Sequence, residues 1–138
     1  MACGMPSTRA SSSEELDLLA QARAAAERAH APYSRFRVGA AVRDRNGQTY
    51  LGCNVESASY GLTLCAERVA IFAAIAAGAP RPLRALAVAC LDSAVGGCVP
   101  CGACRQVMVE HLAEDALVYV GGEVLTPGDL LPRAFRLP

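Results

Sequence analysis

The chain has 138 residues, a length typical of one domain, and 53% of them are hydrophobic and 19% charged, which excludes a disordered chain. Thirteen basic residues are balanced by 13 acidic ones, so there is no net charge to favour binding of nucleic acid or anionic membranes. No apolar run approaches the roughly 20 residues that span a bilayer, and no apolar signal-peptide core is seen. We therefore expect a cytoplasmic protein with a flexible tail, residues 1–12, and a single domain, residues 13–138.

The first half of the chain predicts a helix, a hairpin and a second helix. A capping pattern at Ser12 and Glu15 precedes a segment rich in good helix formers. Asn46-Gly47, between two apolar segments, is a strong hairpin signal, and Gly78 is a typical helix stop. The predicted elements are a helix over residues 13–29, strands over residues 36–42 and 48–55, and a helix over residues 65–77.

The second half predicts strands that alternate with helices. Residues 83–91 form an apolar segment that is typical of a central strand buried on both faces. A helix over residues 101–112, strands over residues 116–120 and 123–125, and a short helix that ends at Leu131 follow. Strand–helix–strand units require right-handed crossovers and place helices on the faces of a sheet. We therefore expect an α/β fold, a three-layer α/β/α domain around a mixed sheet of about five strands.

Three of the seven cysteines lie at predicted helix starts, which favours a metal site. Cys65 begins one helix, whereas Cys101 and Cys104 lie one turn apart at the start of another. The partial positive charge of a helix N-terminus lowers thiol pKa values and favours the thiolate that binds metal. Three protein ligands leave the fourth position of a tetrahedral zinc ion open, as in catalytic zinc sites. We therefore expect one Zn²⁺ per chain.

The other cysteines receive no functional role from the sequence. An odd number of cysteines without a secretion signal argues against a disulfide framework. Cys3 and Cys90 are interpreted as structurally incidental, and Cys53 as a small buried hydrophobe near the site. Pro100 separates Cys98 from the metal motif and forces an extended approach, so Cys98 is not expected to be a fourth ligand.

Glu67 and two arginines complete the predicted centre. Glu67 lies two residues after Cys65, where it can accept a proton near the metal without being a ligand. Three thiolates leave zinc with a net negative charge, which a nearby cation would offset. Arg68 or Arg105 is expected to do this by hydrogen bonding to a ligand sulfur.

These motifs resemble a known family. Cys65-Ala66-Glu67 and Pro100-Cys101-Gly102-Ala103-Cys104 match the signature of zinc nucleobase deaminases. The chain is similar to the small homotetrameric cytidine deaminases that use three cysteines. The further segments that match are residues 32–41, 52–56, 59–61, 130–132 and Phe135. The resemblance implies hydrolysis of cytidine and 2′-deoxycytidine to the uridine forms and ammonia, with zinc-bound hydroxide attacking C4 and Glu67 shuttling the proton.

The resemblance also implies substrate contacts and shared sites. Phe36 would stack on the pyrimidine, and Asn54 and Glu56 would bind the ribose hydroxyls. The backbone N–H of Cys65 or Ala66 would hold the base carbonyl. Tyr60 and Phe135 would reach the site of a neighbouring subunit of the homotetramer.

Other readings remain open on the residues alone. A zinc deaminase of another small aminopyrimidine, such as blasticidin S, shares the metal motif. A polynucleotide editor needs a basic groove and stacking aromatic residues, which a neutral chain with 5% aromatic residues does not favour. A lone Cys-x-x-Cys is also compatible with a non-enzymatic zinc or redox module. Substitution of Glu67 separates these classes, because only an enzyme should lose turnover while keeping its metal.

Overall fold

The computed structural model describes residues 9–92 and 98–138. The elements are helix α1 (Ser13–Ala26), strands β1 (Val38–Arg43) and β2 (Thr49–Cys53), the 3₁₀ turn η1 (Tyr60–Leu62), helix α2 (Ala66–Ala76), strand β3 (Leu83–Cys90), helix α3 (Gly102–His111), strands β4 (Leu112–Val120) and β5 (Glu123–Leu125), and helix α4 (Pro127–Leu130). None of the described helices is both long and apolar enough to cross a membrane.

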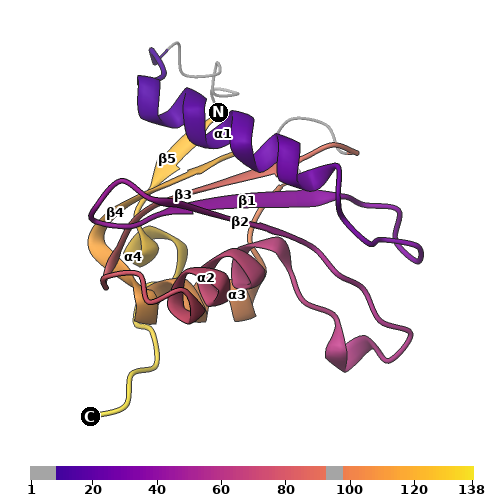
Figure 1. Ribbon diagram of the computed structural model, residues 1–138. Coiled ribbons are helices and arrows are strands. Elements are labelled where there is room, and N and C mark those ends of the chain that lie inside the picture. Colours follow the sequence, from indigo (N-terminus) through magenta and orange to yellow (C-terminus); the bar gives the residue numbers. More distant parts are fainter. Residues whose placement is uncertain (1–8, 93–97) are drawn as a thin grey trace, which may run out of the picture.

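The five strands form one mixed sheet in the order β2-β1-β3-β4-β5. β3 and β4 are parallel, and the other neighbouring pairs are antiparallel. Helix α1 covers one face, and α2 and α3 cover the other (Figure 1). The larger core lies on the face of α2 and α3, and a smaller one lies under α1. This architecture confirms the predicted three-layer α/β/α domain with a mixed five-stranded sheet.

Several predicted element boundaries differ from the observed ones, and three of these differences have a clear physical reason. Helix α1 stops at Ala26 rather than at Ala29, because the next three amides bond only three residues back and form a tight turn. Strand β1 starts at Val38 rather than at Phe36, because Arg35 adopts a left-handed φ of 57°. Strand β4 begins immediately after α3 and is longer than predicted, because Leu112 already pairs with Leu83.

Two glycines allow the helices to approach the sheet closely. Gly39 in β1 faces the backbone of Ala22 in α1, and any Cβ at Gly39 would overlap that backbone. Gly52 in β2 faces α2, where a Cβ would lie 2.5 Å from the carbonyl oxygen of Ala66. The contact at Gly52 sets how closely α2, the helix that carries Glu67, packs against β2.

The sequence interpretation of Cys90 was wrong. Cys90, the last residue of β3, forms a disulfide with Cys98, and their Cα atoms are 5.9 Å apart. An argument from cysteine number cannot detect this pair, because the pairing depends on where the chain returns after β3. Cys3 and residues 1–8 of the expected tail lie outside the described residues. Of the remainder, Arg9 forms an ion pair with the buried Glu15.

Candidate active site

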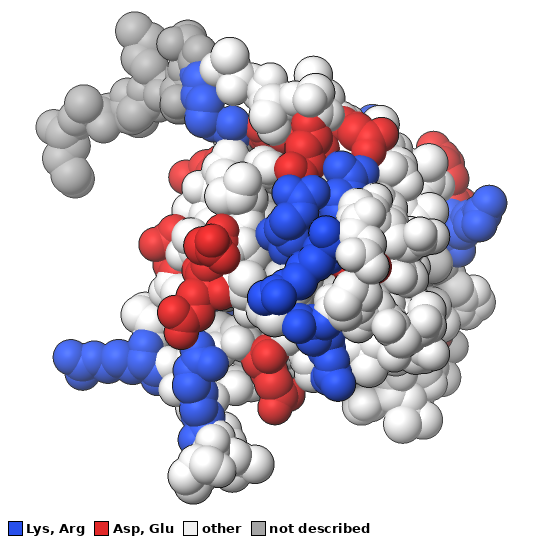
Figure 2. Space-filling model, turned by 60° about the vertical axis from the view of Figure 1, so that its left-hand side comes forward, with Lys and Arg blue, Asp and Glu red and all other residues white. Residues whose placement is uncertain are grey.

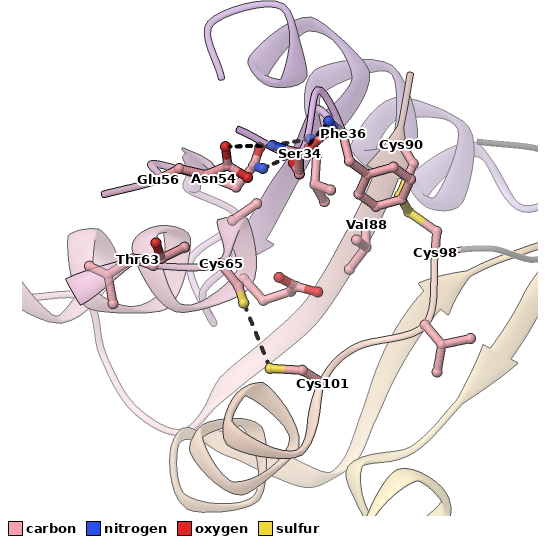
Figure 3. A pocket seen from close by; sticks show the side chains of 15 residues that line it. Ser34, Phe36, Asn54, Glu56, Thr63, Cys65, Val88, Cys90, Cys98 and Cys101 are labelled. Atoms are coloured by element: carbon pink, nitrogen blue, oxygen red, sulfur yellow. Dashed lines mark hydrogen bonds between the residues drawn. A yellow bond between two sulfur atoms is a disulfide. The ribbon is translucent and has the colours of Figure 1, made fainter. Parts of the chain in front are cut away.

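The three predicted metal ligands converge where helices α2 and α3 begin. Cys65 is the N-cap of α2, Cys101 is the N-cap of α3, and Cys104 lies in the first turn of α3. Their three Sγ atoms lie within 4.8 Å of one another. The Cys65 and Cys101 sulfur atoms are 3.7 Å apart (Figure 3). Those of Cys101 and Cys104 are 3.5 Å apart. Tetrahedral Zn–S bonds of about 2.3 Å place sulfur atoms about 3.8 Å apart, so the cluster fits zinc.

Arg68, rather than Arg105, contacts a ligand sulfur. The Nη2 of Arg68 donates to the Sγ of Cys65 at 3.4 Å. Hydrogen bonds from the Cys104 thiol and from Arg68 lower the pKa of Cys65 to about 5, against the opposing effect of burial. The hydrogen bond to Cys65 and burial raise the pKa of Cys104. Arg105 instead donates to the carbonyls of Pro100 and Leu130 and fixes the backbone that leads into α3.

Glu67 lies beside the three thiols but is not part of the candidate metal-binding cluster. It is in the first turn of α2, is only 5% exposed, and its Oε2 accepts from the Cys104 thiol at 3.7 Å. Burial, with the nearby charge of Cys65, raises the pKa of the carboxyl group. A buried carboxyl group at this position can hold a proton next to a metal-bound reactant.

A cavity of about 260 Å³ opens next to the thiols. Cys65 and Cys101 lie at one end of it, and Asn54 and Glu56 lie at the other (Figure 3). Glu67 also lines the cavity, and its contact with the Cys104 thiol places it at the end with the thiols. The predicted substrate residues that line it are Phe36, Asn54, Glu56 and Ala66. The pocket therefore presents metal-binding and proton-transfer groups at one end and hydrogen-bonding groups at the other.

Asn54 and Glu56 follow β2 instead of lying on it, since the strand ends at Cys53. The Oδ1 of Asn54 accepts from the N–H of Val38 at 2.8 Å, and its Nδ2 donates to the carbonyl of Phe36 at 2.7 Å. Glu56 Oε1 accepts from two backbone N–H groups, those of Tyr33 and Ser34, at 3.0 and 3.1 Å. Both side chains thus hold the segment that carries Phe36, a positioning role that sequence reasoning missed.

Two predicted residues lie away from the chain's own pocket. Tyr60 in η1 is 81% exposed and Phe135 is 68% exposed, and neither lines the pocket. Their expected contact with a neighbouring subunit stays a prediction. Cys53 was predicted to be buried near the site, but it is only half-buried and lines a separate hollow with residues of α1, among them Ala24.

Several pocket residues were not predicted, among them Val88 and the Cys90–Cys98 disulfide. Val88 and Cys90 belong to β3, whose apolar pattern indicates only a buried strand. No local signal shows that the end of β3 forms a wall of the cavity. That information lies in the pairing of Val38 with Cys90, which brings the end of β3 beside the Phe36 segment.

Comparison with known proteins gives a consistent result. Residues 12–120 match the family model of the cytidine and deoxycytidylate deaminase zinc-binding region. The cytidine deaminase of Mycobacterium tuberculosis H37Rv is 47% identical over 113 residues, 82% of this chain and 83% of the relative. That of Halalkalibacterium halodurans is 46% identical over 123 residues, 86% and 91% of the two chains. The crystal structure of cytidine deaminase from Burkholderia pseudomallei aligns with a TM-score of 0.79 at 48% identity, covering 87% of this chain and 98% of that one. The chain therefore belongs to the cytidine deaminase family of zinc-dependent hydrolases.

Proposed function

We propose that this enzyme hydrolyses cytidine and 2′-deoxycytidine to uridine and 2′-deoxyuridine, with release of ammonia and with one zinc ion per chain. The observation that carries the proposal is the two-ended pocket. One end holds three converging thiols and a buried carboxyl group, and the other holds an amide and a carboxylate. The family membership and the identity to cytidine deaminases over most of the chain support the same assignment.

Four side chains of this chain would take part in binding the metal. Cys65, Cys101 and Cys104 would hold zinc, and Arg68 would offset the charge of the thiolates through its hydrogen bond to Cys65. Zinc bound by three protein ligands supplies a Lewis acid with one open position, which makes a water molecule easier to deprotonate.

Glu67 would move the proton. Its carboxyl group is buried beside the thiols, so an Oε atom can take a proton from the attacking water. The same carboxyl group would pass this proton to ring N3, then take the second proton from the hydroxyl added at C4 and deliver it to the departing amino nitrogen, so that ammonia leaves and N3 keeps its proton. Because Glu67 is buried, bulk solvent is kept from its carboxyl group. The proton is therefore exchanged with the substrate and the attacking water rather than with bulk solvent.

Other pocket residues would orient the nucleoside. Asn54 and Glu56 supply donors and acceptors that suit ribose hydroxyls. The Phe36 ring would stack on the pyrimidine, and its position depends on the hydrogen bonds of Asn54 to the Phe36 carbonyl and to the N–H of Val38. Ala66 begins α2, where free backbone N–H groups can hold the base carbonyl.

The test is an assay of cytidine deamination by zinc-loaded protein, monitored by the change in ultraviolet absorbance and by the release of ammonia. The Glu67→Gln variant should keep its zinc and lose about 10²–10⁴-fold in kcat, the usual contribution of a general acid–base group. Glu123→Gln makes the same chemical change at an exposed carboxyl group in β5 and should leave activity unchanged. Turnover that survives Glu67→Gln would contradict the proposed proton transfer.

A panel of other substrates separates the remaining alternatives. Zinc-loaded protein that deaminates blasticidin S or another aminopyrimidine, but not cytidine, would overturn the nucleoside assignment and keep the chemistry. A single-stranded polynucleotide is not an expected substrate. On the face drawn in Figure 2, basic side chains form a row, but acidic side chains flank this row. Arg84 and Arg43 form ion pairs with Glu14 and Asp17, so the charges of these arginines are already partly neutralised and contribute less to binding the phosphates of a polynucleotide.

We propose further that the enzyme is a cytoplasmic homotetramer whose sites are shared between subunits. The exposure of Tyr60 and Phe135, two aromatic side chains outside the chain's own pocket, supports the sharing. Sedimentation equilibrium tests the assembly directly. If sites are shared, Tyr60→Ser should raise KM for cytidine while the isolated chain keeps its fold by circular dichroism. A monomer with full activity would overturn this proposal.

A further inference from the structure

The active-site pocket contains a second pair of cysteines besides the proposed zinc ligands. Cys90, the last residue of β3, and Cys98 both line the pocket and are joined in a disulfide. Their Cα atoms are 5.9 Å apart, within the usual range for disulfides. In Figure 3 the disulfide lies beside the Phe36 ring. The bond therefore forms part of the wall of a solvent-open cavity.

The position of this disulfide suits a bond that does more than stabilise the fold. The two cysteines are eight residues apart, so the bond removes less entropy from the unfolded chain than a disulfide that closes a long loop. The disulfides that occur in cytosolic proteins of mesophiles are mainly transient and catalytic or redox-sensing. The bond lines an open pocket in which Cys98 is 9% exposed and Cys90 is half-buried, so a small thiol can approach it from the side of Cys90. The rate of thiol–disulfide exchange depends on this access.

The disulfide holds one end of a segment that matters for zinc. Cys98 is tied to the end of β3, and two residues later the carbonyl of Pro100 accepts from Nε of Arg105 at 2.8 Å. Cys101, a proposed zinc ligand, follows immediately as the N-cap of α3. Between the two attachment points Val99 is exposed and lines the pocket. Loss of the disulfide removes one attachment and leaves Arg105 as the other.

We propose that Cys90 and Cys98 form a reversible dithiol–disulfide couple that controls how firmly the chain holds Cys101 and the pocket wall beside Phe36. The oxidant is a low-molecular-weight disulfide such as oxidised glutathione. One cysteine thiolate attacks it, forms a mixed disulfide and releases one glutathione thiolate. The other cysteine then displaces the second glutathione, so two thiols and one disulfide give the protein disulfide and two glutathione thiols. The effect on substrate binding, though not the couple itself, rests on the proposed function.

The couple is tested by trapping thiols in zinc-loaded protein equilibrated at graded ratios of reduced to oxidised glutathione. Peptide mapping after alkylation should show Cys90 and Cys98 passing together from disulfide to alkylated thiols within the range of ratios. Cys53, a free cysteine in a separate hollow, serves as an internal reference. Two cysteines that are alkylated at every ratio, or a disulfide that persists under excess phosphine reductant, would overturn the proposal.

The consequence for the site is tested by the rate of zinc transfer to a chelator, which needs no turnover. Reduction should speed zinc release about tenfold, the lower end of the effect of removing support from a metal ligand. It should also raise KM for cytidine more than it lowers kcat. The double variant Cys90→Ala/Cys98→Val should release zinc at the rate of the reduced protein under all conditions, whereas Cys53→Ala should keep the full redox response.

Equal release rates and equal KM values in the oxidised and reduced wild-type protein would overturn the control of Cys101. This comparison uses the unsubstituted chain, so it stands even where the double variant does not fold. A protein that deaminates no cytidine would refute the proposed function alone, because thiol trapping and zinc release still report on the couple.

Discussion

Gly52 provides a direct test of how packing positions the active site. In the Gly52→Ala variant the new Cβ would overlap the amide nitrogen of Ala70 and lie 2.5 Å from the carbonyl oxygen of Ala66. Comfortable contact begins near 3.4 Å, so α2 must move away from β2 by roughly 1 Å. The atoms in the way are helix backbone, which cannot rotate aside as a side chain can.

The expected cost has two parts. Forcing an added methyl group into a packed region destabilises proteins by about 1–3 kcal/mol, and a backbone obstacle places this variant at the upper end. With a urea m-value of about 2 kcal/mol/M, the unfolding midpoint should fall by about 1.5 M. The shift of α2 also moves Cys65 and Glu67 relative to Cys101, and a misplacement of this size can cost about 10²-fold in rate.

The assay combines urea unfolding at matched protein and zinc concentrations with zinc content and cytidine turnover of the folded protein. Gly128→Ala is the matched control, because the nearest atom to its new Cβ is 3.8 Å away and α4 carries no site residue. Gly39→Ala is the second comparison. It should be destabilised through α1, yet its folded fraction should keep zinc, since α1 lies on the opposite face of the sheet (Figure 1). A Gly52→Ala protein with wild-type stability and zinc content would refute the reasoning.

Two further predictions follow from the hydrogen bonds around the Phe36 segment. Asn54→Ala leaves the N–H of Val38 and the carbonyl of Phe36 without their partner, so we expect a loss of about 2 kcal/mol in stability and a larger change in KM than in kcat. Steady-state kinetics check this, and an unchanged KM would contradict it. The Arg37 guanidinium and N–H lower the pKa of Asp92 to about 2, so this carboxylate stabilises the fold fully above its usual pKa near 4 and loses that effect as the pH falls through 2. The Tm difference between wild type and Asp92→Asn should therefore be larger at pH 6 than at pH 2.5, and a difference that grows on acidification would refute the assignment.

The sequence by itself determined the features that depend on neighbouring residues. The order of helices and strands follows from periodicity, the Asn-Gly turn and the caps, all of which act over a few residues. The spacing of Cys101 and Cys104 places both on one helical turn, and Glu67 follows Cys65 by two residues in the first turn of α2. These local patterns were sufficient to predict the α/β class, the Cys101–Cys104 pair and the carboxyl group next to Cys65, whereas the approach of Cys65 to that pair depends on tertiary packing.

Tertiary structure decided every feature that depends on where distant segments meet. Arg68 and Arg105 were equivalent candidates in the sequence, but only Arg68 points back over the start of its own helix to Cys65, whereas Arg105 is used by two carbonyls. The disulfide of Cys90 with Cys98 joins the end of β3 to the residues that precede α3. These contacts depend on the direction of each side chain and, for Arg105 and Leu130, on the packing of segments 25 residues apart, and neither leaves a periodic trace in the sequence.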